Sequence, residues 1–185
     1  MIRTIYLYGS QVLREVARPV DIEKERESTS QLVADLWETL KASDGCGLAA
    51  PQIGESLRVA VVDGDVMADV FPYLKGFRRA FINPVVLSES DRSCEYNEGC
   101  LSVPGIYADV RRPESITVEY YDENFEKKTE SFDKFACRMV QHEFSHLDGV
   151  LFTDLVAPIR RKLLTKKLQG IAHGKVGTAY KSKIK

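Results

Sequence analysis

The residues best suited to chemistry in this sequence stand in QHEFSHLDG, from Gln141 to Gly149. Residues four apart on a helix lie on one face, so His142 and His146 can each place an imidazole nitrogen on one divalent metal. Glu143 stands beside them in the position of a general base. Two of the three histidines of the sequence are in this motif. The pattern predicts two metal ligands and a base; the alternative is a structural helix with two partly exposed histidines.

A catalytic site of the zinc type keeps three protein ligands and one open position for water. The HExxHxxGxxH arrangement needs a histidine where this chain has Phe152, so that class is excluded. The acidic residues that follow the motif, Asp148 and Asp154, are too near it for the distant glutamate of thermolysin-like enzymes. The third ligand therefore comes from upstream, or it is His173.

The upstream candidates are cysteines, whose thiolates bind Fe, Zn or Ni strongly. Cys137 precedes His142 by five residues, which places it about 140° round the helix at about 100° per residue, so it points elsewhere. Cys46, Cys94 and Cys100 remain. A lone cysteine is usually a small buried apolar residue, but glycine and proline neighbours give Cys100 a constrained backbone. Cys100 is the favoured third ligand.

Several strands, mostly joined by turns, are expected to surround two or three helices. Apolar residues at helical spacing predict a helix over 28–43 and a second over 134–147, which carries the motif. The second helix has no fully polar face, so we expect strands to enclose it. β-Branched residues predict a strand over 57–63 and a hairpin over 116–132. Pro84, in an extended stretch, favours a sheet edge or a bulge.

Two further stretches concern the substrate side of such a site. GCGLAAPQIG, from Gly45 to Gly54, has the composition of a tight loop that comes close to a ligand, with Gln52 as an amide donor; an ordinary turn is the alternative. Phe135 and Met139 share the helical stripe of the two histidines, where they could line an apolar pocket. Plain core packing is the alternative for each of these two residues.

Length and composition bound the fold and the setting. With 185 residues, 44% hydrophobic and 29% charged, the chain is expected to form one domain with its own core. We expect a cytoplasmic protein without a membrane partner, because the N-terminal residues lack a signal-peptide pattern and no apolar stretch approaches spanning length. The net charge is −1, yet no acidic residue follows Asp154. The basic C-terminal segment, from about residue 159, suits a polyanion or forms a solvated helix face.

GCGLAAPQIG, EGCLSVP and QHEFSHLDG occur in this order, and together they resemble the three signature motifs of peptide deformylases. The resemblance in organisation runs from about residue 2 to residue 158. It implies an α+β fold in which mixed, mostly antiparallel strands in small sheets enclose the HExxH helix. It also implies a single catalytic domain over residues 1–185 that removes the N-formyl group from the formylmethionine of nascent polypeptides.

The same resemblance implies roles for individual residues. The metal is natively Fe²⁺ in the family, while Zn²⁺, Ni²⁺ or Co²⁺ also suit the ligand set. The residues concerned are the ligands Cys100, His142 and His146, the acid/base Glu143, the oxyanion donors Gln52 and Leu101 (through its backbone N–H), and the substrate contact Gly47. We expect Cys46, Phe135 and Met139 to contact the substrate as well.

Three features depart from the family pattern. Residues 64–79 form a longer surface excursion than in compact members, and Arg138 is a charge where the family more often has an apolar residue. The basic end does not closely match the C-terminal helix of those members, so the resemblance only suggests ribosome association.

Two other functions remain as alternatives. One is a zinc metallopeptidase of the HExxH type, against which the missing downstream ligand argues. The other is a non-catalytic ribosome- or RNA-binding module that uses the basic segment. The acidic body and the lack of aromatic residues among the basic ones weaken it, and we expect no sequence-specific nucleic acid binding.

Overall fold

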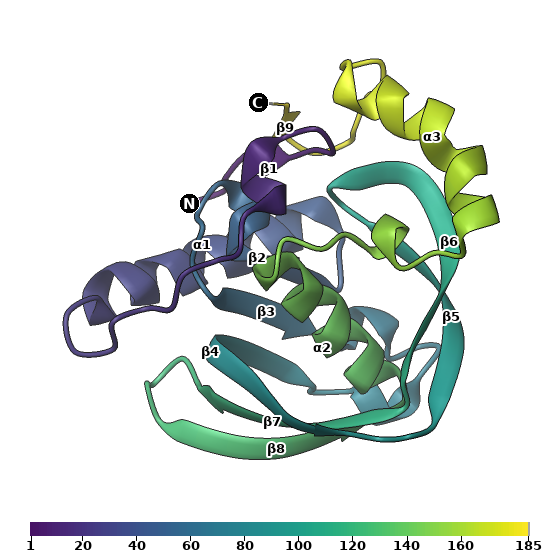
Figure 1. Ribbon diagram of the computed structural model, residues 1–185. Coiled ribbons are helices and arrows are strands. Elements are labelled where there is room, and N and C mark those ends of the chain that lie inside the picture. Colours follow the sequence, from purple (N-terminus) through teal and green to yellow (C-terminus); the bar gives the residue numbers. More distant parts are fainter. Residues whose placement is uncertain (185) are drawn as a thin grey trace.

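Helix α2 (Lys134–Leu147) lies between a five-stranded sheet and a two-stranded ribbon (Figure 1). The computed structural model describes residues 1–184. The larger sheet has the order β2-β3-β4-β7-β8 with every pair antiparallel, and β5 and β6 form the ribbon. The predicted α+β class, with small and mostly antiparallel sheets around the HExxH helix, is confirmed. The strands of these two sheets are β2 (Gly47–Ala49), β3 (Val59–Asp63), β4 (Arg78–Glu89), β5 (Ser93–Cys100), β6 (Val103–Pro113), β7 (Ser115–Tyr121) and β8 (Lys127–Asp133).

Helix α2 has the bounds that its apolar spacing predicts. Its buried face packs on the inner face of the larger sheet, where the Phe144 ring meets the Phe81 ring edge to face at 5.2 Å. Val140 and Leu147 are fully buried in the same cluster. Because most of the helix is covered, three of the charged or polar residues it carries, Arg138, Glu143 and His146, are buried.

Helix α1 (Arg26–Ser43) begins two residues before the predicted helix and ends at the predicted residue. Leu36 and Leu40 are buried against a second core cluster, which also contains Leu48 and Val61. The helix ends at Asp44, whose φ of 56° is left-handed, a conformation that aspartate tolerates better than most residues.

The GCGLAAPQIG stretch is more regular than its composition predicts. Residues Gly47–Ala49 form the edge strand β2, and a 3₁₀ turn, η2 (Ala50–Ile53), follows it. The prediction of a loop is therefore wrong for these residues. Glycine and alanine have low strand propensity, but pairing with β3 and complete burial of Leu48 override that preference.

The predictions for β4, β7 and β8 are confirmed. Between Ile82 and Val85 the register of β4 against β7 shifts, so Pro84 lies at a bulge. β7 and β8 pair along their whole length as a hairpin. The excursion over residues 64–79 contains two short 3₁₀ turns, η3 (Asp65–Met67) and η4 (Pro72–Leu74).

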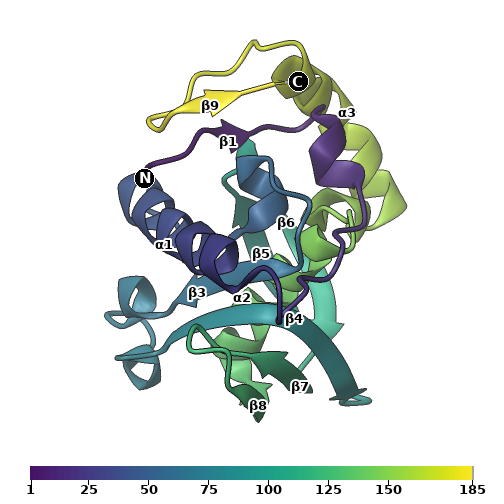
Figure 2. The same ribbon diagram turned by 90° about the vertical axis from the view of Figure 1, so that its left-hand side faces the viewer.

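The two ends of the described chain lie together. Helix α3 (Pro158–Ala172) makes up most of the basic segment, and the chain then returns so that β9 (Ser182–Lys183) pairs in parallel with β1 (Ile5–Tyr6), as Figure 2 shows. Short 3₁₀ turns also occur at Gln11–Arg14 (η1) and Phe152–Asp154 (η5). Within residues 1–184, none of the helices combines the length and apolar character needed to cross a membrane.

Candidate active site

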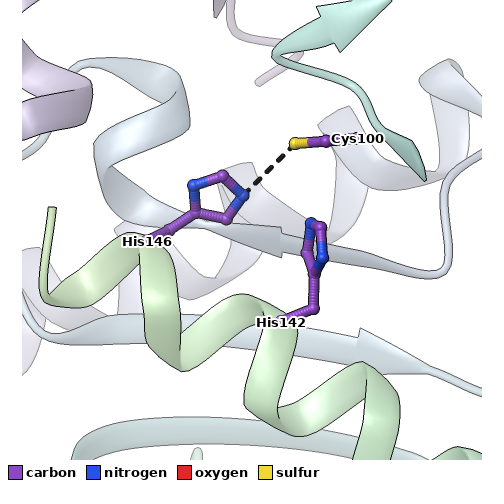
Figure 3. A group of neighbouring side chains, drawn as sticks. All are labelled: Cys100, His142 and His146. Atoms are coloured by element: carbon purple, nitrogen blue, oxygen red, sulfur yellow. Dashed lines mark hydrogen bonds between the residues drawn. The ribbon is translucent and has the colours of Figure 1, made fainter. Parts of the chain in front are cut away.

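One thiol and two imidazoles converge where β5 meets α2. His142 and His146 rise from successive turns of α2 toward Cys100 at the end of β5 (Figure 3). Cys100 Sγ lies 3.3 Å from His146 Nε2, and the ligand atoms of the three residues all lie within 4.8 Å of one another. A Cys/His₂ donor set of this size fits one divalent metal with a position left open.

Glu98 contacts one of these candidate ligands, His142, and was not predicted from the sequence. Its Oε2 lies 2.8 Å from His142 Nδ1. An ionised carboxylate only accepts hydrogen bonds, so His142 Nδ1 carries the proton and Nε2 is left to bind a metal. The available signal was its place in the EGC motif, two residues before Cys100 on the same strand.

Two arginines hold the Glu98 carboxylate. Arg112 Nε donates to Glu98 Oε1 at 2.7 Å and Arg138 NH1 donates to the same oxygen at 2.8 Å. Burial alone would raise the pKa of Glu98, but hydrogen bonds from His142 and Arg112 outweigh it and hold the pKa well below its usual range. Arg138 is the charged residue at a position where the family more often has an apolar one. It is buried here as a second cation beside the Glu98 carboxylate.

Replacing Glu98 by glutamine (Glu98→Gln) is expected to lower metal affinity by about 10–100-fold, because His142 loses its charged partner. The free energy of unfolding is expected to fall by about 3–5 kcal/mol, since two buried arginines lose their counter-charge. Competition with a chelator and denaturant unfolding measure the two effects. Glu119→Gln, on a partly exposed ion pair with Lys127, is the control. Metal affinity equal to that of the unmodified protein would contradict this role of Glu98.

The electrostatics around the two imidazoles differ. Burial, followed by the positive charges of His142 and Arg112, lowers the pKa of His146 well below its ordinary value, so this imidazole is neutral as a ligand must be. Burial opposes a charge at His142, but Cys100 and Glu98 outweigh it and raise its pKa to about 10. Surroundings that favour a proton on His142 also favour a metal cation there.

Glu143 follows His142 in α2 as a buried carboxylate. Burial raises the pKa of Glu143 to about 7, and within residues 1–184 its Oε2 has no hydrogen-bond partner. Gly47 on β2 passes directly against it: a β-carbon at this position would lie 2.4 Å from Glu143 Oε1. Only glycine leaves room there for the carboxylate.

Replacing Gly47 by alanine (Gly47→Ala) is expected to push the Glu143 carboxylate aside. A displacement of about 1 Å at a reacting group can cost about 10²-fold in rate, and overpacking typically costs about 1–3 kcal/mol of stability. Steady-state kinetics and thermal unfolding measure both. Gly170→Ala is the matched control, because nothing lies within 4 Å of a β-carbon there and the helix is expected to gain about 0.5–1 kcal/mol. Wild-type kcat in Gly47→Ala would refute the steric argument.

Gln52 and Leu101 complete the arrangement on the thiol side. The Gln52 side-chain oxygen accepts the Ala49 N–H at 2.9 Å, which turns its amide nitrogen toward Cys100 Sγ at 3.5 Å and Ser102 Oγ at 3.1 Å. Leu101 and Ser102 form the two-residue turn that joins β5 to β6. The structure therefore brings both predicted oxyanion donors next to Cys100.

The predicted substrate contacts lie in different surroundings. Burial, then the charge of Glu143, raises the pKa of Cys46 to about 12, so it is a neutral thiol near the carboxylate. The Phe135 ring stacks on Phe71 of the excursion at 4.7 Å. Met139 is buried in the core cluster between α2 and the larger sheet. Packing in the core accounts for the contacts of Met139. The role of Met139 in lining a substrate pocket stays a prediction.

The other candidate ligands lie elsewhere. Cys137 Sγ accepts a hydrogen bond from Gln141 at 2.9 Å and points away from the histidines, as its helical position predicts. Cys94 contacts the Arg138 guanidinium at 3.4 Å. His173 is at the end of α3, with its ring against the Gln169 carbonyl.

The family model for polypeptide deformylases matches residues 2–162. The chain belongs to the peptide deformylase family. The peptide deformylase of Flavobacterium psychrophilum is 41% identical over 191 residues, covering 100% of this chain and 97% of the relative. That of Pseudothermotoga lettingae is 43% identical over 180 residues, covering 97% and 98%. The crystal structure of a peptide deformylase from Legionella pneumophila is similar with a TM-score of 0.81 and 34% identity, covering 95% of this chain and 98% of that one.

Proposed function

We propose that this peptide deformylase family member removes the N-formyl group from formylmethionine at the N-terminus of nascent polypeptides, with Cys100, His142 and His146 holding one divalent metal. The observation that carries the proposal is the convergence of these three donors within 4.8 Å beside the buried Glu143. The comparisons favour neither a metallopeptidase nor an RNA-binding module. The reaction is hydrolysis of a linear amide, which yields formate and a free amino terminus.

The metal supplies Lewis-acid chemistry when bound, including a fall in the pKa of coordinated water to about 7. Glu143 accepts the proton of the attacking water and later delivers it to the departing amine. Its partly unpaired carboxylate, held in place by packing against Gly47, leaves an oxygen free for that proton. Because Glu143 is buried, a proton transferred to it is shielded from bulk water.

Negative charge that grows on the formyl oxygen is met by fixed donors. The Gln52 amide is oriented by Ala49 and Ser102, and we assign the second donor to the Leu101 backbone N–H. Donors held by the protein need no reorganisation as charge develops, which is why such groups contribute strongly to rate.

The tight packing around Glu143 supports discrimination for formyl groups. A formyl group carries only hydrogen on its carbonyl carbon, whereas acetyl carries a methyl group. A β-carbon on Gly47 would clash with Glu143, so the backbone of β2 lies directly against this carboxylate. We propose that this wall, with Cys46 beside it, admits formyl and excludes acetyl, and that Phe135 lines the methionine side chain with Met139 behind it.

We propose Fe²⁺ as the native metal, with Zn²⁺, Ni²⁺ and Co²⁺ able to occupy the same ligands. The basic segment of α3 is proposed to associate with the ribosome, where the nascent substrate emerges. Its exposed lysines and arginines, together with the lack of acidic residues after Asp154, support contact with a polyanion.

The test combines anaerobic purification, metal analysis and an assay with formyl-Met-Ala-Ser. We expect one metal per chain and release of formate, with activity lost in air and retained after replacement by Ni²⁺. A metal-loaded protein that leaves the formyl peptide unchanged would overturn the proposed function. Cleavage of an internal peptide bond instead would support a metallopeptidase.

A further inference from the structure

The segment that follows α3 reaches back to the turn beside Cys100. Residues 181–183 run alongside β1, where Ile5 N–H donates to the Lys181 carbonyl and Leu7 N–H donates to the Lys183 carbonyl, both at 2.9 Å (Figure 2). The hydroxyl of Thr178 bonds the Tyr180 carbonyl at 2.7 Å. These contacts anchor the segment on both sides of Tyr180 and hold its side chain against the core.

Tyr180 then makes a specific contact with the turn. Its hydroxyl donates to the carbonyl oxygen of Leu101, and its ring is half-buried against the core cluster on which Leu101 also packs. Packing of the ring against the core does not require the hydroxyl group. The hydrogen bond from the hydroxyl to Leu101 therefore needs an explanation of its own. The segment lies beyond residue 162, where the family match ends.

The contact restricts the peptide group that joins Leu101 to Ser102. Its carbonyl oxygen accepts from Tyr180, and its N–H, which belongs to Ser102, points to Cys100 Sγ at 3.4 Å. A peptide group is planar, so holding both of these atoms fixes its plane. The Leu101 N–H lies on the adjoining peptide group, separated from this plane by only two rotatable bonds.

Other contacts hold the far side of the same turn. Tyr8 N–H donates to the Ser102 carbonyl at 2.8 Å, and the Gln52 amide donates to the Ser102 hydroxyl at 3.1 Å. Ser102 is thus fixed through both its backbone and its side chain. The carbonyl of Leu101 is held by Tyr180, from a segment nearly eighty residues away in sequence.

We propose that Tyr180 is a positioning residue for catalysis, whose hydroxyl fixes the Leu101 peptide plane so that the Leu101 N–H is aimed at the formyl oxygen. The inference rests on the proposed function, because it assigns Tyr180 a part in orienting one of the two oxyanion donors. The Tyr180 hydroxyl contacts the Leu101 carbonyl, and its effect on catalysis passes through this contact.

The test replaces Tyr180 by phenylalanine (Tyr180→Phe), which keeps the ring and removes the hydroxyl. Loss of one hydrogen bond that aims a donor is expected to lower kcat by about three- to tenfold, with KM and metal content unchanged. The melting temperature is expected to shift by no more than about 4 °C. Tyr121→Phe, at a half-buried tyrosine at the end of β7, is the matched control and is expected to retain wild-type kcat.

A measurement independent of turnover is the ¹H–¹⁵N spectrum of the Zn²⁺-loaded protein. Tyr180→Phe is expected to shift the amide resonances of Leu101 and Ser102, and to leave those of Val140 and Phe144 in α2 unchanged. Unchanged kcat in Tyr180→Phe would overturn the inference. A fall in activity explained wholly by lost metal, a rise in KM alone, or unshifted Leu101 and Ser102 amides would overturn it too. If the proposed function itself were wrong, the wild-type protein would also be inactive. This outcome distinguishes it from failure of the inference about Tyr180.

Discussion

Replacing Glu143 by glutamine (Glu143→Gln) is expected to lower kcat by about 10²–10⁴-fold, the contribution typical of a positioned general acid–base group. The metal content is expected to stay near one per chain, because Cys100, His142 and His146 are untouched. Glutamine keeps the shape of the side chain beside Gly47 and cannot accept the proton of water. Formate release under single-turnover conditions, with metal analysis of the same sample, measures the effect.

The control for this substitution is Glu130→Gln on β8. Glu130 is a partly buried carboxylate that accepts hydrogen bonds from Arg79 and Tyr120. It is expected to lose some stability and to keep wild-type kcat. Activity in Glu143→Gln close to that of the wild-type protein would remove Glu143 from the mechanism, whereas parallel loss of activity and metal would make it a structural residue.

Replacing Gln52 by alanine (Gln52→Ala) is the second large effect, with kcat expected to fall by about 10²–10³-fold, as for removal of one oxyanion donor. The metal ligands remain, so metal content is expected to change far less than turnover. Some stability is also lost, because the Ala49 N–H is left buried without its acceptor, at a cost of about 1–3 kcal/mol.

Gln52→Glu separates the two roles of this side chain. Glutamate still offers an oxygen to the Ala49 N–H, but it replaces the amide donor near Cys100 with a carboxylate oxygen. We expect turnover as low as in Gln52→Ala, with metal content measured alongside. Gln31→Ala, which removes an amide bonded to Asp35 on α1, is the remote control. Wild-type kcat in both Gln52 variants would rule out an oxyanion role.

The local sequence was sufficient to predict the elements whose apolar residues recur at a clear helical or strand spacing. The helix over 134–147 and the hairpin over β7 and β8 have the predicted positions, because their side-chain spacing matches one secondary structure only. Strand β2 was not predictable in this way. Its glycine and alanine residues have little preference for a strand, and it forms because β3 and the buried interior stabilise it.

The buried ion pairs of Glu98 with Arg112 and Arg138 could not be predicted from the sequence either. Charged residues are nearly always exposed unless paired, so Arg112 and Arg138 have no local feature that indicates burial. Their partner Glu98 comes from another strand, and its link to His142 joins residues 44 positions apart. Only the packing of β5 and β6 against α2 decides that these charges meet.

The sequence by itself determined the family and the helix that carries the two histidines and Glu143. A single helix is enough to place two histidines four residues apart, and the glutamate between them, on adjacent faces. The three motifs together indicated the family. Tertiary structure alone decided how those groups are oriented. Glu98 orients His142, Gly47 confines Glu143, and Tyr180 holds the Leu101 turn. Orientation depends on contacts between segments distant in the chain, which no local pattern encodes.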